Sequence, residues 1–407
     1  MNNNKAIKGN KVIINNNRIL EVNDRPFFPI GARHMPLGGT IELLNQTGFN
    51  CMRWMVFGAD ANERIQMCLP PNDMEEMLFY PYVYNKADFS EDKEKKTRQL
   101  KELIEYVRFH KAMLCYEQRN EPAWNFGDFS RYKSAPEGLL EGSNFIRELD
   151  PDHPIRIGHG NCNLISTLKR YNEAVDIVGC NPYIVNPPGL RVNVSSRFDG
   201  KAVDSPNQTL SAVGDYTTKM MRVAGGKAVW MQLQAMANED WYNEHYTPWN
   251  RGEGAYEYQR LYPSAWQMRF MAFNAIVRGA TALEWAMYKL PVCSNAWNDV
   301  CKVIGELNGL QEILTSPTCM CELMIEYIEL GFSDWTGIEV MVKIFNGKPW
   351  IFAVNTQFDP AEAKFYSLPE GIGNYLEVYG ENREVGIEGG CFTDRFQPYE
   401  VHIYKSC

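Results

Sequence analysis

The chain alternates between short apolar runs and longer stretches in which apolar residues recur with helical spacing. Short runs bounded by Gly, Pro and Asn are typical of buried strands, and the stretches between them are typical of amphipathic helices. Strands are expected at residues 27–34, 49–56, 77–83, 111–120, 155–159, 175–183, 228–234 and 282–287. Strands that alternate with helices predict a parallel sheet with helices packed around it.

Two choices stay open in this pattern. For the third strand, residues 65–69 compete with residues 77–83. A doubly wound sheet competes with a closed barrel, but such a sheet usually carries a Gly-rich phosphate-binding turn after its first strand. Gly31-Ala32-Arg33-His34 is not such a turn. The sequence therefore predicts an α/β fold in which residues 26–316 form a (β/α)8 TIM barrel.

The pattern changes on both sides of this region. Residues 1–25 predict a β-hairpin that turns through Asn15-Asn16-Asn17. After residue 316 the helical periodicity stops, and an Asn346-Gly347 hairpin signal separates two short alternating runs. The runs in this part are residues 323–329, 339–345, 348–354, 363–367, 375–379 and 399–404. Residues 317–407 are therefore expected to form a small antiparallel β-sandwich domain packed on the barrel.

Composition narrows the classes of function. A chain of 407 residues has room for one barrel and a small second domain, and its hydrophobic fraction of 45% is ordinary for a globular protein. The formal net charge of −9 argues against a nucleic-acid partner, which a basic surface would attract. No apolar run approaches the roughly 18 residues that a membrane span needs, so no membrane partner is expected.

The cysteines and the N-terminus bear on localisation. The 11 Cys are an odd number and lie mostly within expected strands and helices, which suits free thiols in a reducing, cytoplasmic compartment. The N-terminus has no apolar signal region, which agrees with a cytoplasmic protein. A secreted protein whose signal has been removed is the alternative, and both localisations stay open.

The candidate chemistry centres on residues 113–124, which start as an apolar strand and end in Asn120-Glu121-Pro122-Ala123-Trp124. Pro122 cannot donate to a sheet ladder, so the strand ends before it. Glu121 is therefore expected at the carboxyl end of a buried strand, where parallel barrels build their active sites. A solvated acid at a strand end is the plain alternative, because charged residues are mostly exposed.

Polar and aromatic side chains also stand at the carboxyl ends of the expected strands. They are Arg53, Asn120, His159, Tyr183, Glu284 and Trp285. The structural alternatives are an ion pair for the arginine, core packing for the aromatic residues and a satisfied loop position for the histidine. Their joint occurrence at matching strand ends favours a site at the mouth of the barrel.

Over the barrel region this pattern resembles the clan A glycoside hydrolases, whose acid/base motif is Asn-Glu-Pro. The resemblance implies that Glu121 is the general acid/base, and that Arg53 and Asn120 bind the sugar and the nucleophile. It also implies that Tyr183 donates to the nucleophile and that Trp285 floors the sugar site. Such enzymes use two carboxyl groups: one protonates the leaving oxygen, and the other attacks from about 5 Å away or activates water from farther away.

The sequence departs from that family at the expected nucleophile, which should be a Glu at the end of the seventh strand. Gln234 occupies this place, and an amide is neither charged nor a good leaving group. Four explanations stay open: an engineered Glu→Gln variant, a second carboxylate from elsewhere, an inverting mechanism with a more distant base, or a barrel that binds sugar without cleaving it. The candidates for the second carboxylate are Glu239, Glu244, Glu253 and Glu284.

Aromatic residues crowd the loop after the seventh strand, among them Trp241 and Trp249. Their faces would stack on sugar rings, and with Trp124 and Trp297 they would wall an extended cleft for an oligosaccharide or polysaccharide. A loop that packs on its own aromatic residues is the structural alternative. Trp124, Glu239, Trp241 and Trp249 therefore join the candidate substrate-binding residues.

Other chemistries find little support. The six His form no HxxxH or HxH pair, so no metal is expected, and no phosphate-binding loop or GxSxG turn occurs. No cofactor is expected. The sequence predicts a glycosidase that cleaves O-glycosidic bonds with Glu121, and a catalytically inactive carbohydrate-binding barrel is the alternative. The oligomeric state stays open.

Overall fold

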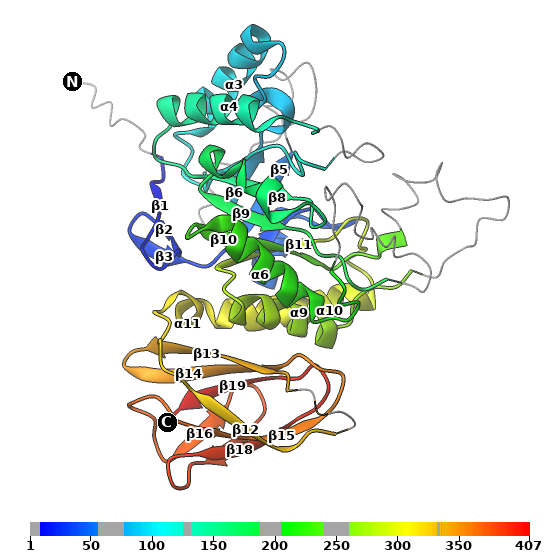
Figure 1. The fold of residues 1–407 in the computed structure, drawn as a ribbon. Helices are drawn as coiled ribbons and strands as arrows, with labels where there is room; N and C mark the ends of the chain where they lie inside the picture. The colour runs from blue at the N-terminus through cyan, green and yellow to red at the C-terminus, as the bar shows by residue number, and fades with distance from the viewer. Residues whose placement is uncertain are drawn as a thin grey trace, which may run out of the picture.

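Eight parallel strands close into a barrel, which lies above the C-terminal sheets in Figure 1. The computed structural model describes residues 9–55, 77–124, 132–186, 205–239, 260–331, 334 and 336–407. The barrel strands, in chain order and in order around the ring, are β4 (Ile30–Ala32), β5 (Cys51–Met55), β6 (Leu78–Tyr82), β7 (Tyr116–Glu117), β8 (Ile155–His159), β9 (Ile177–Cys180), β10 (Ala228–Gln234) and β11 (Ala282–Ala286). β11 pairs with β4 and closes the ring.

The closed ring confirms the predicted TIM barrel and excludes an open doubly wound sheet. β6 confirms residues 77–83 as the third strand. The competing residues 65–69 lie outside the described part of the chain.

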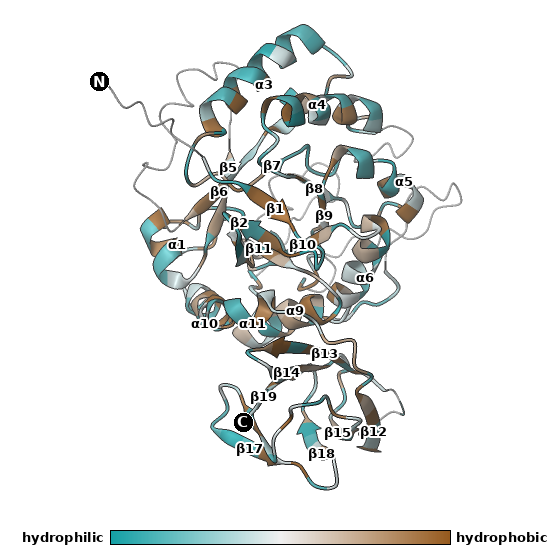
Figure 2. Ribbon diagram, turned by 90° about the vertical axis from the view of Figure 1, so that its left-hand side faces the viewer, coloured by the Kyte–Doolittle hydropathy of each residue, from teal (hydrophilic) through white to brown (hydrophobic). Residues whose placement is uncertain are grey.

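Helices separate the strands and surround the barrel. They are α1 (Ile41–Thr47), η1 (Tyr84–Ala87), α3 (Lys93–Val107), α4 (Pro136–Leu149), α5 (Ile165–Lys169), η2 (Asn172–Ala174), α6 (Ala212–Ala224), α9 (Ala265–Val277), α10 (Asn295–Gly309) and α11 (Gln311–Thr315). Thr40 accepts a hydrogen bond from the Leu43 N–H at the start of α1, and Ser264 forms a capping box with Gln267 at the start of α9. The surface of α3 is mostly hydrophilic, as expected of an outer helix (Figure 2).

The inside of the barrel holds charged side chains. Successive residues of a strand face opposite sides of the sheet. Arg53, Glu117, Arg156 and Glu284 come from four different strands and meet inside the ring. The guanidinium carbon of Arg156 also lies 4.2 Å from the centre of the Trp230 ring. Charged residues are almost never fully buried unless they are paired, so this interior depends on its ion pairs.

The C-terminal region consists of two antiparallel sheets. One contains β12 (Met324–Glu329), β15 (Ala361–Tyr366) and β18 (Phe392–Phe396), and the other contains β13 (Ile338–Phe345), β14 (Lys348–Asn355), β19 (Val401–Ser406), β16 (Tyr375–Val378) and β17 (Arg383–Gly386). Asn346 and Gly347 have positive φ and join β13 to β14, as the hairpin signal predicts. Phe392 of one sheet packs on Tyr404 of the other, with ring centroids 4.9 Å apart. The predicted β-sandwich is confirmed, although β17 and β18 were not expected.

The N-terminal sheet has three strands, β1 (Val12–Ile14), β2 (Leu20–Val22) and β3 (Arg25–Phe27), where the sequence predicts one hairpin. Asn23 and Asp24 have φ of 51° and 62° and form a second turn, because both residue types tolerate this conformation. The Val12 N–H donates to the Asp152 carbonyl oxygen at 2.8 Å, in the turn that precedes β8. This sheet therefore lies at the amino ends of the barrel strands, away from the mouth.

Helix α9 lies between the barrel and the C-terminal sheets (Figure 1). Phe273 of α9 stacks on Phe352 of β14 with ring centroids 6.0 Å apart, and Arg269 donates to the Val401 carbonyl oxygen at 2.7 Å. None of the described helices is long and apolar enough to span a membrane.

Candidate active site

Glu121 lies at the mouth of the barrel, beyond the end of β7 at Glu117. Its side chain is half-buried, and its Oε1 accepts a hydrogen bond of 2.7 Å from the Asn181 side chain, just beyond β9. Its backbone N–H donates to the Gly158 carbonyl oxygen of β8 at 2.7 Å. Its φ of 51° is uncommon for a residue other than glycine and persists where neighbours fix the backbone. Contacts to β8 and to the end of β9 therefore hold Glu121 in a defined direction.

Arg33, which the sequence pattern did not single out, holds Asn120 in place. Arg33 follows β4, and its Nη2 donates to Asn120 Oδ1 at 2.9 Å. Its Nη1 donates to Glu117 and to Glu284, at 3.1 Å each. One guanidinium therefore connects the residue before Glu121 to the charged interior of the barrel.

Below the mouth, arginines and glutamates form one buried network. Its members are Arg33, Arg53, Arg156, Glu117 and Glu284. Arg53 Nε donates to Glu117 Oε2 at 2.5 Å, so the structural alternative of an ion pair holds for this arginine. Arg53 also lies 3.8 Å from the centre of the Tyr82 ring, through its guanidinium carbon. The described contacts of Arg53 are therefore with Glu117 and with the Tyr82 ring, inside the barrel.

The Glu284 carboxylate is fully buried and bonded at both oxygens. Arg156 Nη2 donates to Oε1 at 2.6 Å, and the Tyr80 hydroxyl donates to Oε2 at 2.6 Å. Burial alone would raise the pKa of Glu284, but the Arg156 and Arg33 guanidiniums and the Tyr80 hydroxyl hold it well below its usual range. Both oxygens of Glu284 are therefore occupied by partners inside the barrel, and its role as the second catalytic carboxylate stays a prediction.

Gln232 of β10 stands beside Tyr183, which follows β9. Its amide Nε2 donates to the Tyr183 hydroxyl, and its side chain is nearly fully buried. Gln234 is bound elsewhere: its Oε1 accepts from the Val185 N–H at 2.9 Å, and its Nε2 donates to the carbonyl oxygens of Val185 and Met236. The Gln234 amide is therefore held by backbone groups, whereas the Gln232 amide lies beside Tyr183, and the nucleophile position stays a prediction.

The Tyr183 hydroxyl stays protonated. Burial raises its pKa, Arg33 opposes that rise, and the carboxylates of Glu121 and Glu284 add to it. Asn181 also bonds to Tyr183 and so lies between Glu121 and this hydroxyl. Because Gln232 donates to the hydroxyl oxygen, the Tyr183 O–H is left to donate to a ligand.

Two predicted site residues face away from the mouth. Trp285 follows the inward-facing Glu284 in β11 and is fully buried on the opposite side of the sheet. His159 lies against the Tyr171 ring at 5.9 Å, outside the ring of strands, and burial and Lys219 lower its pKa to about 3. The predictions that Trp285 floors the sugar site and that His159 binds substrate are therefore wrong.

The remaining predicted residues divide by location. Trp124 is half-buried and packs beside Gly160, where an added Cβ would come 3.0 Å from the Trp124 Cβ. Glu239 is buried, and its Oε1 accepts from the Leu261 N–H at 2.7 Å. Trp297 is buried in α10, so it does not wall a cleft. Trp241, Trp249, Glu244 and Glu253 lie outside the described residues.

The pattern missed three residues that contact the site: Arg33, Asn181 and Gln232. Strand alternation could have found Arg33 and Gln232, since each shares a face with an inward-facing residue two positions away, Gly31 and Trp230. Asn181 carried no signal of its own, since the sequence pattern put it inside the expected strand 175–183, whereas β9 ends at Cys180.

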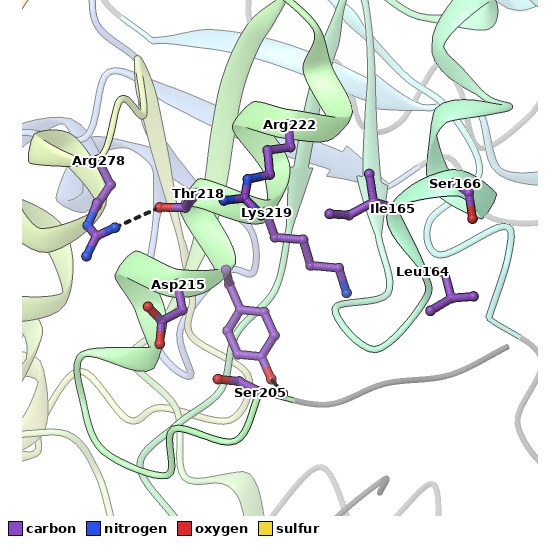
Figure 3. A pocket seen from close by; sticks show the side chains of 10 residues that line it. Leu164, Ile165, Ser166, Ser205, Asp215, Thr218, Lys219, Arg222 and Arg278 are labelled. Carbon is purple, nitrogen blue, oxygen red and sulfur yellow. Dashed lines mark hydrogen bonds between the residues drawn. The ribbon is translucent and has the colours of Figure 1, made fainter. Parts of the chain in front are cut away.

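No metal site occurs among the described residues, where no group of three or more His, Cys, Asp or Glu side chains is arranged to hold an ion. A separate hollow of about 660 Å³ lies on the outer layer, between α5 and α6 (Figure 3). Tyr216, Lys219 and Arg222 line it, and Arg278 donates to Thr218 at 3.1 Å beside it. It contains none of the residues around Glu121.

Comparisons with known proteins support the fold. No family model and no curated protein matches the chain. Among solved structures, a glycoside hydrolase family 5 protein from Bacteroides vulgatus ATCC 8482 is 11% identical, covers 97% of this chain and 93% of its own, and has a TM-score of 0.58. A β-galactosidase from Bacillus circulans sp. alkalophilus is 8% identical, covers 94% and 99%, and has a TM-score of 0.56.

A glycoside hydrolase family 5 mannosidase from Rhizomucor miehei is 13% identical, covers 75% of this chain and all of its own, and has a TM-score of 0.50. At these identities the likeness shows a shared fold. The chain therefore has the barrel architecture that these glycosidases use.

Proposed function

We propose that the chain is a glycoside hydrolase that cleaves O-glycosidic bonds of an oligosaccharide or polysaccharide, with Glu121 as the group that protonates the leaving oxygen. The observation that carries this proposal is the half-buried Glu121 carboxyl, held by Asn181 at the mouth of a closed barrel beside the Arg33–Asn120 pair. Solved glycosidases with the same fold support it.

The groups around Glu121 suit this reaction. Asn181 donates to Oε1, so Oε2 is the oxygen that carries the proton toward the glycosidic bond. The Asn120 amide oxygen accepts from Arg33, which turns its amino group toward the ligand. The Tyr183 hydroxyl offers a further donor for a sugar hydroxyl.

The amide of Gln232 constrains the second half of the reaction. A retaining enzyme needs a carboxylate nucleophile about 5 Å from the acid, whereas an inverting enzyme needs a base roughly 6.5–9.5 Å away with room for water. Glu117 and Glu284 are bound by arginines below the mouth. Water attack with a more distant base is therefore the form of the reaction that an amide at residue 232 permits.

Carbohydrate binding without cleavage is the second candidate function, and Gln232 is the observation that favours it. A panel of plant, algal and microbial polysaccharides separates the two functions when binding and the release of reducing ends are measured on the same samples. The proposal predicts that at least one glycan is both bound and cleaved. Binding with no release of reducing ends would support the second function instead.

A further inference from the structure

We propose that the glycan recognised at this mouth carries carboxylate or sulfate groups, and that Arg119 binds one of them. The inference rests on the proposed function, because it names the substrate class of the same site. Three observations support it: the state of Arg119, the cation beside it, and the charge balance of the barrel interior.

Arg119 is two residues before the proposed proton donor and has no acidic partner among the described residues. Its guanidinium carbon lies 4.2 Å from the centre of the Tyr84 ring, and its side chain is partly exposed. The Nε and Nη1 atoms are buried and donate no hydrogen bond within the described structure. Leaving buried donors unpaired is costly, and a guanidinium matches the paired oxygens of a carboxylate or sulfate.

A second cation stands at the same part of the rim. Lys133 is exposed and interacts electrostatically with Glu121, Arg119 and Tyr84. The Tyr84 ring is 43% exposed, so it offers a face for a sugar ring next to both cations. Two cations thus stand around one acid at the position where a substrate would meet Glu121.

The barrel interior carries an excess of positive charge. Among the described residues, three arginines face two glutamates in its buried network, which leaves one positive charge in excess. Gln232 contributes an amide at this level instead of a carboxylate. His34 beside Arg33 adds no charge, because burial and the nearby arginines lower its pKa to about 3.

The local excess of positive charge stands out because the whole chain is acidic. A formal net charge of −9 would repel an anionic glycan, so binding one requires cations gathered at the site. Arg119, Lys133 and the buried arginines supply that gathering next to Glu121. A neutral glycan can also accept hydrogen bonds from this guanidinium, but without the added strength and paired geometry that a carboxylate or sulfate gives.

The test uses matched pairs of glycans that differ only in charge. One pair is an oligogalacturonate and its carboxyl-reduced form, and the other is a carrageenan oligosaccharide and its desulfated form. Calorimetry on the full chain should show at least one anionic member binding about tenfold or more tightly than its neutral partner, as a charge-assisted hydrogen bond predicts. The pair that responds tells carboxylate from sulfate. Arg119→Gln should remove this preference, and Arg119→Lys should keep part of it.

Arg170→Gln is the control. Arg170 also lies over a tyrosine ring, that of Tyr132, but it is exposed and paired with Glu137. It should leave the preference unchanged. Equal affinity for both members of each pair, binding of neither anionic member, or a preference that survives in Arg119→Gln would overturn the inference. Measuring the release of reducing ends on the same samples keeps the two proposals apart. Preference for the anionic glycan without cleavage contradicts the proposed hydrolase function. Cleavage of neutral glycans without a preference for anionic ones contradicts this inference.

Discussion

Glu121 lies four residues beyond the end of β7, so no strand pairing fixes its backbone. Contacts with neighbouring residues fix the direction of its side chain instead. The left-handed backbone at Glu121 costs on the order of 1 kcal/mol or more, and the bond to the Gly158 carbonyl oxygen holds it. Gly158 also gives Asn120 its space, because an added Cβ there would come 2.9 Å from Asn120 Oδ1. The site therefore depends on small residues and backbone groups as much as on its acid.

At the same scale, Gln232→Glu should create the missing carboxylate. It would stand beside the Tyr183 hydroxyl, above a network with one excess positive charge that favours ionisation. We expect the hydrolysis rate to rise about tenfold or more through nucleophilic catalysis. Mass spectrometry should detect a covalent adduct at residue 232 with a fluorinated glycoside. An unchanged rate without an adduct would argue against residue 232 as the nucleophile position.

Gln234→Glu is the matched comparison. The Gln234 amide donates to two carbonyl oxygens, and a carboxylate would set like partial charges against each other there. This variant should gain no activity and should unfold at lower temperature.

At the scale of elements, the barrel is closed by strands that approach closely where a glycine allows it. Gly179 of β9 faces β10, and an added Cβ would come 1.7 Å from the Trp230 carbonyl oxygen. Asn181 and Tyr183 follow β9, and Gln232 lies in β10, so this seam sets the distance between the two sides of the site.

Gly179→Ala should therefore destabilise the fold by about 3 kcal/mol or more, because the backbones of β9 and β10 must separate. Urea unfolding followed by circular dichroism measures this loss. Gly305→Ala is the control, since an added Cβ there meets nothing within 4 Å, and it should stabilise α10 by roughly 0.5–1 kcal/mol. Similar urea midpoints for Gly179→Ala and the wild type would show that the seam can adjust.

Most of these elements could be predicted from the sequence, because apolar runs and helical spacing report burial directly. β8 and β10 begin and end where the pattern puts them, and the third strand was chosen correctly. β17 and β18 were missed, since Arg383–Gly386 and Phe392–Phe396 are short and contain charged residues.

The site was harder to predict. The end of a strand fixes how close a residue lies to the mouth of the barrel, but whether its side chain points into or out of the barrel depends on the alternation along the strand. Trp285 and His159 stand at the right height but on the outer face. Gln232 was passed over for Gln234, since nothing in the sequence shows that the Gln234 amide binds the backbone of Val185. Glu121 was placed at the mouth because Pro122 was expected to end a strand over residues 111–120, but the observed strand β7 already ends at Glu117.

At the scale of the whole molecule, α9 connects the barrel to the C-terminal sheets. Its Phe273 ring stacks on Phe352, and its Arg269 side chain donates a hydrogen bond to the Val401 carbonyl oxygen. The C-terminal sheets hold a titratable cluster of their own. His402 lies 3.0 Å from Asp394, with Glu381, Glu400 and Arg383 around the pair. Stability of this region should therefore depend on pH.

The sign follows from the two shifts. Burial opposes both charges, but Arg383 and His402 lower the pKa of Asp394, while Asp394 and Glu400 raise the pKa of His402. Ionised Asp394 stabilises the folded state above its unfolded pKa of about 3.9, and this stabilisation is lost as the pH falls through its lower folded pKa. Protonated His402 stabilises the folded state below its unfolded pKa of about 6.5, and this stabilisation is lost as the pH rises through its higher folded pKa. Both contribute between about pH 4 and 6.5.

His402→Gln should therefore lower the free energy of unfolding by roughly 1–2 kcal/mol more near about pH 5.5 than near about pH 9. Thermal unfolding of the two proteins across this range measures the difference. His153→Gln gives a comparison outside this cluster, since His153 pairs with Asp150 just before β8 of the barrel. A loss in His402→Gln that is the same at both pH values would indicate a packing role on Phe396 alone.

The measurement that bears most directly on Glu121 as proton donor compares the wild type with Glu121→Ala on aryl glycosides of the sugar that the panel identifies. A general acid matters most when the leaving group is poor. We predict a loss of about 10²–10⁴-fold on the phenyl glycoside, a far smaller loss on the dinitrophenyl glycoside, and unchanged glycan affinity. Equal losses on both glycosides, or full activity on the phenyl glycoside, would contradict the account.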